Sequence, residues 1–369
     1  MKIEMVDLES QYLRLKEEID QAIRESIASF QFINGHAVLQ FERELADYLN
    51  VDHVVSCANG TDALQIALMA CDFNDGDEII LPAFTYASIA EACILLKLVP
   101  VMIDVDIESY NIDPEQVKKA ITSRTRAIVP VHLFGQFCNL NEIKKIATNR
   151  DIMIIEDNAQ SVGGFTDIDD NIVLNGDIGC TSFFPSKNLG CFGDGGAMYT
   201  NNAKLAQKMR LISRHGQKSR FDHEVLGVNS RLDTIQANIL RVKLKELDNF
   251  IEKRRAVGSY YSKRLQGLGE VIVPQVKNRY FHVYNQYTLR VLNGKRNGLK
   301  RFLSDAGIPS KIYYPKPLYA QNAFKSYYKG ENLPATERLC AEVLSIPIHT
   351  EMNTATQNYI CDHIIKYFK

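Results

Sequence analysis

The chain has 369 residues, of which 46% are hydrophobic and 24% are charged. A chain of this length and composition can bury a large core and divide into one large and one small domain, which excludes an intrinsically disordered protein. Its 43 basic and 44 acidic residues leave a formal net charge of -1. This balance gives no overall attraction to nucleic acid or to an anionic membrane, so we expect neither as a partner. An anionic ligand would need a local site.

The cysteine and histidine patterns argue against disulfides and metal sites. The eight cysteines include no C-x-x-C pair and mostly lie inside apolar runs, which is typical of buried free thiols in a reducing cytosol. The eight histidines include no pair with metal-ligand spacing, so we expect no bound metal. The N-terminus has no apolar signal-peptide core, and no stretch approaches about 18 uncharged apolar residues. We therefore expect a cytoplasmic protein that does not span a membrane.

In chain order, the first segments predict two helices and then alternating strands and helices. Apolar side chains recur at helical spacing over residues 9–27 and 37–49. Apolar runs then predict strands at residues 54–56, 78–81, 99–105, 126–132, 151–157, 180–184 and 197–200. Helical segments, such as residues 62–70, separate these strands. This alternation indicates an α/β fold with a mostly parallel sheet covered on both faces. Ligands of such sheets bind at the carboxyl ends of the strands.

The last third of the chain has a different pattern. A long, highly charged helix is predicted over residues 231–268 as a connector between domains. Beyond it we expect a strand at residues 285–291 and helices at residues 298–306, 335–344 and 354–367, which is typical of an α+β domain. We therefore predict a large domain over residues 1–250, which includes the N-terminal helix, and a small α+β domain over residues 251–369.

One lysine has an unusual setting. Lys187 follows an apolar, β-prone run that ends at Pro185, and a glycine-dense turn comes after it, so it should lie just past a strand end. Aromatic neighbours and closely approaching backbone would partly desolvate this lysine, which lowers its pKa and makes the neutral amine available as a nucleophile toward carbonyls. Taken alone, the segment is better explained as a surface lysine in a glycine-rich turn.

Two further segments suit charged groups of a ligand. The run Asn59-Gly60-Thr61-Asp62 lies between a strand and a helix, where free N–H groups and the helix dipole favour an anion such as phosphate. An ordinary helix cap explains this run as well. Asp157 ends an apolar strand, where a carboxylate is costly unless it has a cationic partner such as a protonated pyridine nitrogen. A helix cap or a metal ligand is the alternative for Asp157.

The segment at residues 183–197 resembles the Schiff-base lysine segment of the pyridoxal-phosphate-dependent nucleotide-sugar aminotransferases, the DegT/DnrJ/EryC1/StrS family. Segments at residues 56–64, 84–87, 156–161 and 227–234 agree in the same order. The resemblance spans essentially the whole chain. It implies an aspartate-aminotransferase-like fold (fold type I), in which the large domain binds pyridoxal 5'-phosphate (PLP).

The resemblance also implies roles for individual residues. Lys187 is the catalytic lysine, which forms a Schiff base with PLP. The residues implied to contact the cofactor phosphate are Gly60, Thr61, Ser182 and Asn229. Tyr86 would stack on the cofactor ring, Asp157 would pair with the ring nitrogen, and Gln160 would lie near the ring hydroxyl. The residues that line the nucleotide-sugar pocket are Phe32, Ser186, Arg231, Tyr313 and Tyr314. For Phe32 and Tyr86, core packing is the alternative. Asn229 reaches in from a second subunit, so a homodimer with shared active sites is implied.

The reaction that the resemblance implies is PLP-dependent transfer of an amino group from L-glutamate, which becomes 2-oxoglutarate, to a nucleotide-linked ketosugar. Residues 181–187, 214–217 and 228–231 are most similar to the branch that aminates C3 of UDP-linked 2-acetamido-3-ketosugars, including the 3-keto uronic acid. That branch supplies diamino sugars for surface polysaccharide such as lipopolysaccharide O-antigen. Arg231 is the candidate for the uronate carboxylate.

Other substrates and one other function stay open. The family commonly has histidine where this chain has Tyr313, and often histidine where it has Tyr319, so a neutral UDP-linked 3-ketosugar, a dTDP-3-ketohexose or a UDP-4-ketohexose is an alternative substrate. An amino-acid aminotransferase of the same fold is another alternative, with Arg290 as an anchor for the α-carboxylate. The alternative that is not an enzyme is a PLP-sensing regulatory protein.

Overall fold

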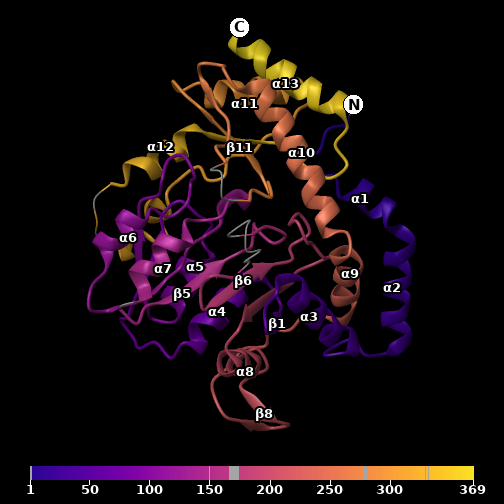
Figure 1. The fold of residues 1–369 in the computed structure, drawn as a ribbon, viewed down its shortest axis with the longest axis vertical. Helices are drawn as coiled ribbons and strands as arrows, with labels where there is room; N and C mark the ends of the chain where they lie inside the picture. Colours follow the sequence, from indigo (N-terminus) through magenta and orange to yellow (C-terminus); the bar gives the residue numbers. More distant parts are fainter. Residues whose placement is uncertain (1, 149, 166–173, 277–280, 329, 331) are drawn as a thin grey trace.

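The computed structural model describes residues 2–148, 150–165, 174–276, 281–328, 330 and 332–369. A seven-stranded sheet has helices packed on its faces, and a smaller group of helices and strands is formed by the C-terminal part of the chain (Figure 1). The strands of the large sheet are β1 (His53–Cys57), β2 (Glu78–Pro82), β3 (Val99–Ile103), β4 (Thr125–Ile128), β5 (Met153–Asp157), β6 (Ile178–Ser182) and β7 (Gly196–Thr200).

The order of strands in this sheet is β1-β7-β6-β5-β4-β2-β3. Neighbouring strands from β6 to β3 run parallel, and β7 is antiparallel to both β1 and β6. The sheet is thus mostly parallel, as the alternation of strands and helices predicts. In such a sheet the carboxyl ends of the parallel strands share one edge, and β5 and β6 end there at Asp157 and Ser182.

Helices cover both faces of this sheet. They are α3 (His36–Leu49), α4 (Gly60–Ala70), α5 (Ser88–Leu95), α6 (Pro114–Ala120), α7 (Leu140–Thr148), α8 (Ala203–Ile212) and α9 (Thr234–Leu244). In β5, Ile155 packs in the cluster formed with α4, α5 and α8, whereas its neighbour Ile154 packs with α6 and α7. Successive side chains of a strand point to opposite faces, so this division confirms the α/β fold with a doubly covered sheet.

The C-terminal part forms a second sheet with its own apolar cluster. Its strands are antiparallel in the order β10-β11-β12, and their bounds are β10 (Val271–Ile272), β11 (Tyr287–Val291) and β12 (Val343–Ile346). The accompanying helices are α10 (Leu247–Leu265), α11 (Arg296–Asp305), α12 (Pro334–Glu342) and α13 (Thr354–Phe368). Ile3 from the N-terminus also packs in this cluster. The domain boundary near residue 250 stays a prediction.

Two helices that the sequence predicts as continuous are broken. The helix expected over residues 9–27 is α1 (Leu8–Arg14) followed by α2 (Lys16–Ser29), and the one expected over residues 231–268 is α9 followed by α10. At both breaks a backbone N–H bonds three residues back, from Leu15 to the Tyr12 oxygen at 3.0 Å and from Glu246 to the Lys243 oxygen at 3.1 Å. Such a bond tightens the last turn and ends the helix, although the apolar spacing continues across it.

Strand β12 was not predicted. Residues 335–344 read as one helix, but the helix ends at Glu342, and the apolar residues after it form β12. The new strand pairs with β11, with Leu289 opposite Leu344. This partner is distant in the sequence, so the local pattern carries no signal for the pairing.

A two-stranded hairpin, β8 (Gln217–Ser219) and β9 (Asp222–His223), extends away from the body beyond α8 (Figure 1). All eight cysteines are free thiols, and all but the half-buried Cys71 are buried, as predicted. Within the described ranges, no helix is both long enough and apolar enough to cross a membrane.

Candidate active site

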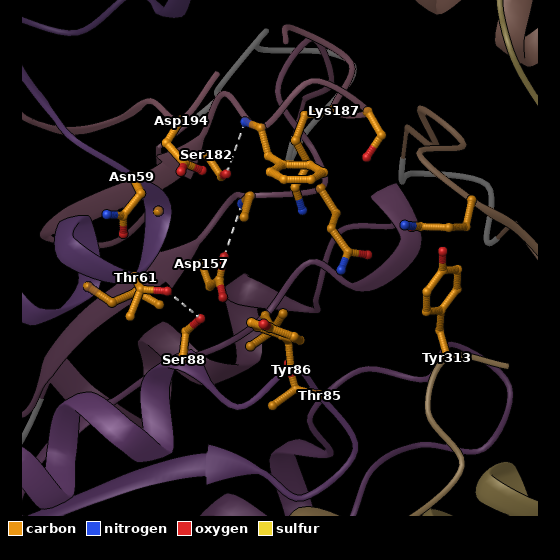
Figure 2. Close-up of a pocket in the computed structure, with 18 of the residues that line it drawn as sticks. Asn59, Thr61, Thr85, Tyr86, Ser88, Asp157, Ser182, Lys187, Asp194 and Tyr313 are labelled. Atoms are coloured by element: carbon orange, nitrogen blue, oxygen red, sulfur yellow. Dashed lines mark hydrogen bonds between the residues drawn. The ribbon is translucent and has the colours of Figure 1, made fainter. Parts of the chain in front are cut away.

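A cavity of about 610 Å³ opens at the carboxyl edge of the large sheet. The turn before α4, the loop after β2, the end of β5 and the segment after β6 all contribute to its walls. Tyr313 lies across the cavity from Ser182 and Asp194 (Figure 2). Ten of the residues predicted from the sequence line this one cavity, and they are Gly60, Thr61, Tyr86, Asp157, Gln160, Ser182, Ser186, Lys187, Tyr313 and Tyr314.

The start of α4 is built to receive an anion. The Asn59 side chain accepts the N–H of Asp62 at 2.8 Å, and the Asn59 carbonyl accepts the N–H of Ala63 at 3.1 Å. The N–H groups of Gly60 and Thr61 precede these two on the first turn, where an α-helix supplies no partner of its own. The Thr61 hydroxyl bonds to the Ser88 hydroxyl at 2.8 Å (Figure 2). These groups form a cradle suited to a phosphate.

Gly60 is required at this position by close packing on β6. A side chain there would place its Cβ 2.7 Å from the Cβ of Ser182. Real Cβ atoms do not approach that closely, so only glycine lets the helix start lie against the strand end. As a result, the Ser182 hydroxyl and the first N–H groups of α4 face the same cavity.

Asp157 brings a carboxylate to the cavity from the end of β5. Its Oδ1 accepts the backbone N–H of Ala159 at 3.0 Å. Burial raises the pKa of Asp157, while the Ala159 hydrogen bond and the nearby Lys187 act in the opposite direction. A carboxylate in this setting is stabilised by a cationic partner.

Lys187 lies on the loop that follows β6. The loop closes through backbone hydrogen bonds from Cys191 to the Phe183 oxygen at 2.8 Å and from Lys187 to the Phe184 oxygen at 2.8 Å. Burial lowers the pKa of Lys187, and the attraction of Asp157 offsets part of this effect. The loop therefore holds an amine that loses its proton more easily than an exposed lysine, as the sequence predicts.

Gln160 is oriented by the backbone. Its Oε1 accepts the N–H of Phe134 at 2.6 Å, and its Nε2 donates to the Tyr314 hydroxyl at 3.4 Å. Burial raises the pKa of Tyr314, so this hydroxyl keeps its proton. The Tyr86 ring lies 6.4 Å from the Tyr314 ring, centroid to centroid, and Tyr86 is 62% exposed. The core interpretation of Tyr86 is therefore wrong.

Three predicted residues do not line the cavity of their own chain. Asn229 is exposed and pairs with Arg214 in an isolated β-bridge, and Arg231 is half-buried two residues later. Phe32 is 44% exposed, so its core interpretation is wrong as well. The Ser230 hydroxyl accepts the Ala58 N–H at 3.0 Å, which places this segment behind the turn before α4.

The sequence reasoning missed several residues of the cavity wall. They are Thr85, Ser88, Phe184, Asp194 and Gln286, besides Asn59, which was considered only as part of the turn. Ser88 had a weak signal, because a small polar residue follows a strand end by a few positions. Gln286 had none, since it comes from the segment before β11.

The cavity fits PLP on its own chemistry. It combines a helix start for the phosphate, a carboxylate for the ring nitrogen and a partly desolvated amine for the aldehyde. In the part of the chain that the structure describes, no group of three His, Cys, Asp or Glu side chains could hold a metal ion.

The model of the DegT/DnrJ/EryC1/StrS aminotransferase family matches residues 13–365. The chain belongs to this family. A relative from Pseudomonas aeruginosa, named UDP-2-acetamido-2-deoxy-3-oxo-D-glucuronate aminotransferase, is 42% identical over 97% of this chain and 98% of its own. A relative from Geobacillus stearothermophilus, named pleiotropic regulatory protein, is 40% identical over 100% of this chain and 99% of its own. Other relatives are named as transaminases of dTDP-linked amino sugars.

Solved structures of this aminotransferase family have the same fold. DesV from S. venezuelae, in complex with a ketimine intermediate, has a TM-score of 0.96 at 33% identity, over 100% of this chain and 99% of that chain. NtdA from Bacillus subtilis, with the bound cofactor PMP, has a TM-score of 0.89 at 30% identity, over 95% of this chain and 81% of that one. The chain is a PLP-dependent aminotransferase, and the fold expected from the resemblance is confirmed.

Proposed function

We propose that this aminotransferase transfers the amino group of L-glutamate to the C3 keto carbon of a UDP-linked 2-acetamido-3-ketosugar, with the 3-keto uronic acid as the preferred substrate. The observation that carries the proposal is the 42% identity, over nearly the full length of both chains, to the relative named for that uronate. The product would be a 2,3-diamino sugar for surface polysaccharide.

The residues of the cavity take the following roles in the proposal. Lys187 would hold PLP through its aldehyde group, and its partly desolvated amine would serve to move a proton at the carbon that gains the amino group. Asp157 would keep the ring nitrogen protonated, and Gly60, Thr61 and Ser182 would hold the phosphate. When bound, PLP acts as an electron sink for the negative charge that develops at that carbon.

Gln160 and Tyr86 complete the cofactor site in the proposal. The Phe134 N–H fixes the Oε1 of Gln160, so the Nε2 of Gln160 remains to donate toward the ring hydroxyl. The exposed Tyr86 ring is available to stack on the cofactor. Ser186, Tyr313 and Tyr314 lie in the same cavity and would contact the sugar nucleotide.

We further propose that the active enzyme is a homodimer. Asn229, Arg231 and Phe32 lie outside the cavity of their own chain and reach solvent at least in part, so a second copy can carry them to the cavity of the first. Asn229 would then contact the phosphate and Arg231 the uronate carboxylate, for which guanidinium is the favoured partner.

The anchor suggested for an amino-acid aminotransferase is contradicted by the structure. Arg290 is 4% exposed, forms an ion pair with Glu342 at 2.8 Å and donates to the Ile107 oxygen at 3.3 Å. A guanidinium held in this way is not available for the α-carboxylate of a substrate. The dTDP-3-ketohexose alternative keeps support from the relatives named for dTDP-linked sugars.

The test compares the UDP-linked 3-keto uronate with its 6-hydroxymethyl analogue in the wild type and in Arg231→Ala. We expect the wild type to prefer the uronate by roughly one to two decades in kcat/KM, since a hydrogen bond to a charged group contributes about 1.5–3 kcal/mol. The preference should disappear in Arg231→Ala and persist in Arg301→Ala, a control on the exposed face of α11.

Three outcomes of the same assay would contradict parts of the proposal. An acid preference that survives Arg231→Ala removes Arg231 from this role. Faster turnover of a UDP-4-ketosugar overturns the assignment to C3, and faster turnover of a dTDP-3-ketohexose overturns the nucleotide. Bound cofactor without turnover of any ketosugar would favour the regulatory function named for the Geobacillus relative.

A further inference from the structure

Glu156, the residue directly before Asp157 in β5, is fully buried with 0% exposure. Its Oε1 accepts the backbone N–H groups of Asn175 at 2.8 Å and Gly176 at 2.5 Å. Its Oε2 lies 3.0 Å from Nε2 of His132, which is also 0% exposed. The carboxylate is therefore compensated by three donors from two other segments of the chain, as burial of a charge requires.

The backbone fixes the position of the proton on His132. The Cys138 N–H donates to Nδ1 of His132 at 3.0 Å, so Nδ1 is an acceptor. A neutral imidazole that accepts at Nδ1 carries its proton on Nε2, and that N–H donates to Glu156. The ring also lies 4.5 Å from the Phe137 ring, centroid to centroid, which limits its rotation. His132 and Glu156 thus form a pair with a single donor direction.

This pair lies directly behind Asp157. The backbone N–H of His132 donates to the backbone carbonyl oxygen of Asp157 at 3.1 Å, and the backbone N–H of Asp157 donates to the carbonyl oxygen of Pro130 at 2.9 Å. Successive side chains of a strand point to opposite faces, so Glu156 points away from the cavity that Asp157 lines. Among the described residues, the Asp157 carboxylate has one hydrogen bond, from Ala159, so its direction depends largely on the backbone.

We propose that Glu156 and His132 are positioning residues, which clamp the end of β5 to the segment after β4 and so aim the Asp157 carboxylate at the ring nitrogen of the cofactor. The inference rests on the proposed role of Asp157. Neither residue lines the cavity. A one-residue shift of β5 against its neighbour would turn Asp157 away from the cavity, and the clamp resists that shift.

Glu156→Gln tests the clamp with little change in shape. An amide has one acceptor and one donor end. If Oε1 continues to accept from Asn175 and Gly176, then Nε2 faces the Nε2–H of His132, donor against donor. If the amide is reversed, its NH2 group faces the two backbone N–H groups instead. His132 cannot relieve the first conflict by moving its proton, because Nδ1 would then oppose the Cys138 N–H.

The readout is the dissociation constant of pyridoxamine 5'-phosphate, measured by absorbance titration without turnover. We expect Glu156→Gln to weaken binding about tenfold in the wild-type background and by less than about twofold when Asp157→Asn is already present. The effects of the two substitutions should not add, because Glu156 acts through Asp157. Glu42→Gln is the matched control. Glu42 is also a buried carboxylate, bonded to Ser56 and Arg210, and does not line the cavity, so its loss should leave binding unchanged.

The outcomes separate this inference from the proposed role of Asp157. If Asp157→Asn alone leaves binding unchanged, the role of Asp157 fails. If Asp157→Asn weakens binding but Glu156→Gln does not, or does so equally in both backgrounds, the clamp fails. Nitrogen-15 NMR of His132 in the wild-type holoenzyme needs no variant. A proton on Nε2 supports the clamp, and a proton on Nδ1 overturns it.

Discussion

The side-chain oxygen of Gln160 accepts the backbone N–H of Phe134 at 2.6 Å, and this bond determines which end of the amide faces the cavity. Gln160 therefore acts as a donor. Its Nε2 reaches the Tyr314 hydroxyl at 3.4 Å, next to the position proposed for the ring hydroxyl of the cofactor.

Gln160→Glu should keep the bond to Phe134 and lose the donor. We expect an unchanged thermal midpoint and a fall in kcat/KM of roughly one to two decades, since a hydrogen bond to a charged acceptor contributes about 1.5–3 kcal/mol. Steady-state kinetics together with the absorption spectrum of the bound cofactor check this expectation. If kcat/KM of the variant equals that of the wild type, Gln160 makes no contact that matters to the reaction.

Gly60→Ala should damage the phosphate cradle. The added Cβ would lie 2.7 Å from the Ser182 Cβ, so the start of α4 must move away from β6. We expect a loss of about 1–3 kcal/mol in the free energy of unfolding, together with weaker binding of pyridoxamine 5'-phosphate. Gly269→Ala is the control, because a Cβ there meets no atom within 4 Å. Equal effects of the two changes would mean that the close approach at Gly60 is unimportant.

Lys243 gives a prediction about stability and pH. This residue is 2% exposed, and its amine donates to Gln11 at 3.0 Å and lies 4.8 Å from the centre of the Phe192 ring. Burial lowers the pKa of Lys243 to about 8 from its ordinary value of 10.5. The folded protein therefore binds fewer protons than the unfolded chain between these two values, so this group makes stability rise with pH there.

The comparison with Lys243→Met isolates this effect. Below about pH 8 the buried charge lowers the free energy of unfolding of the wild type by on the order of 3 kcal/mol, since one pKa unit corresponds to about 1.4 kcal/mol. Above about pH 10.5 the amine is neutral in both states, so this cost disappears. We expect the variant to be the more stable protein at neutral pH, with the difference shrinking as pH rises. Denaturant unfolding at several pH values measures it. A difference that stays constant with pH would contradict the pKa shift.

Much of the fold was predictable because its signals are local. The apolar strands of the large sheet and the helices between them follow directly from periodicity. The breaks at Leu15 and Glu246 were missed because apolar spacing continues through a single tightened turn. Strand β12 was missed because its pairing with β11 depends on residues such as Leu289, which lie far away in the sequence.

The same distinction applies to the site. Thr61, Asp157 and Lys187 were predictable because each lies at or just after the end of a strand of a mostly parallel sheet, and parallel strands end at one edge. Gln286 comes from a different part of the chain, and no motif marks it. Asn229 and Arg231 were identified through the family resemblance alone, and they do not line the cavity of their own chain. Their proposed place in an active site depends on a second copy, which one sequence does not describe.

The identity of the lysine that binds PLP is the central claim, and reduction with borohydride followed by peptide mass mapping tests it most directly. Reduction converts a lysine–PLP linkage into a stable pyridoxyl group. We predict this group on the peptide that contains Lys187 in the wild type and on no lysine in Lys187→Ala. A pyridoxyl group on another lysine of the wild type, or one that persists in Lys187→Ala, would contradict the account.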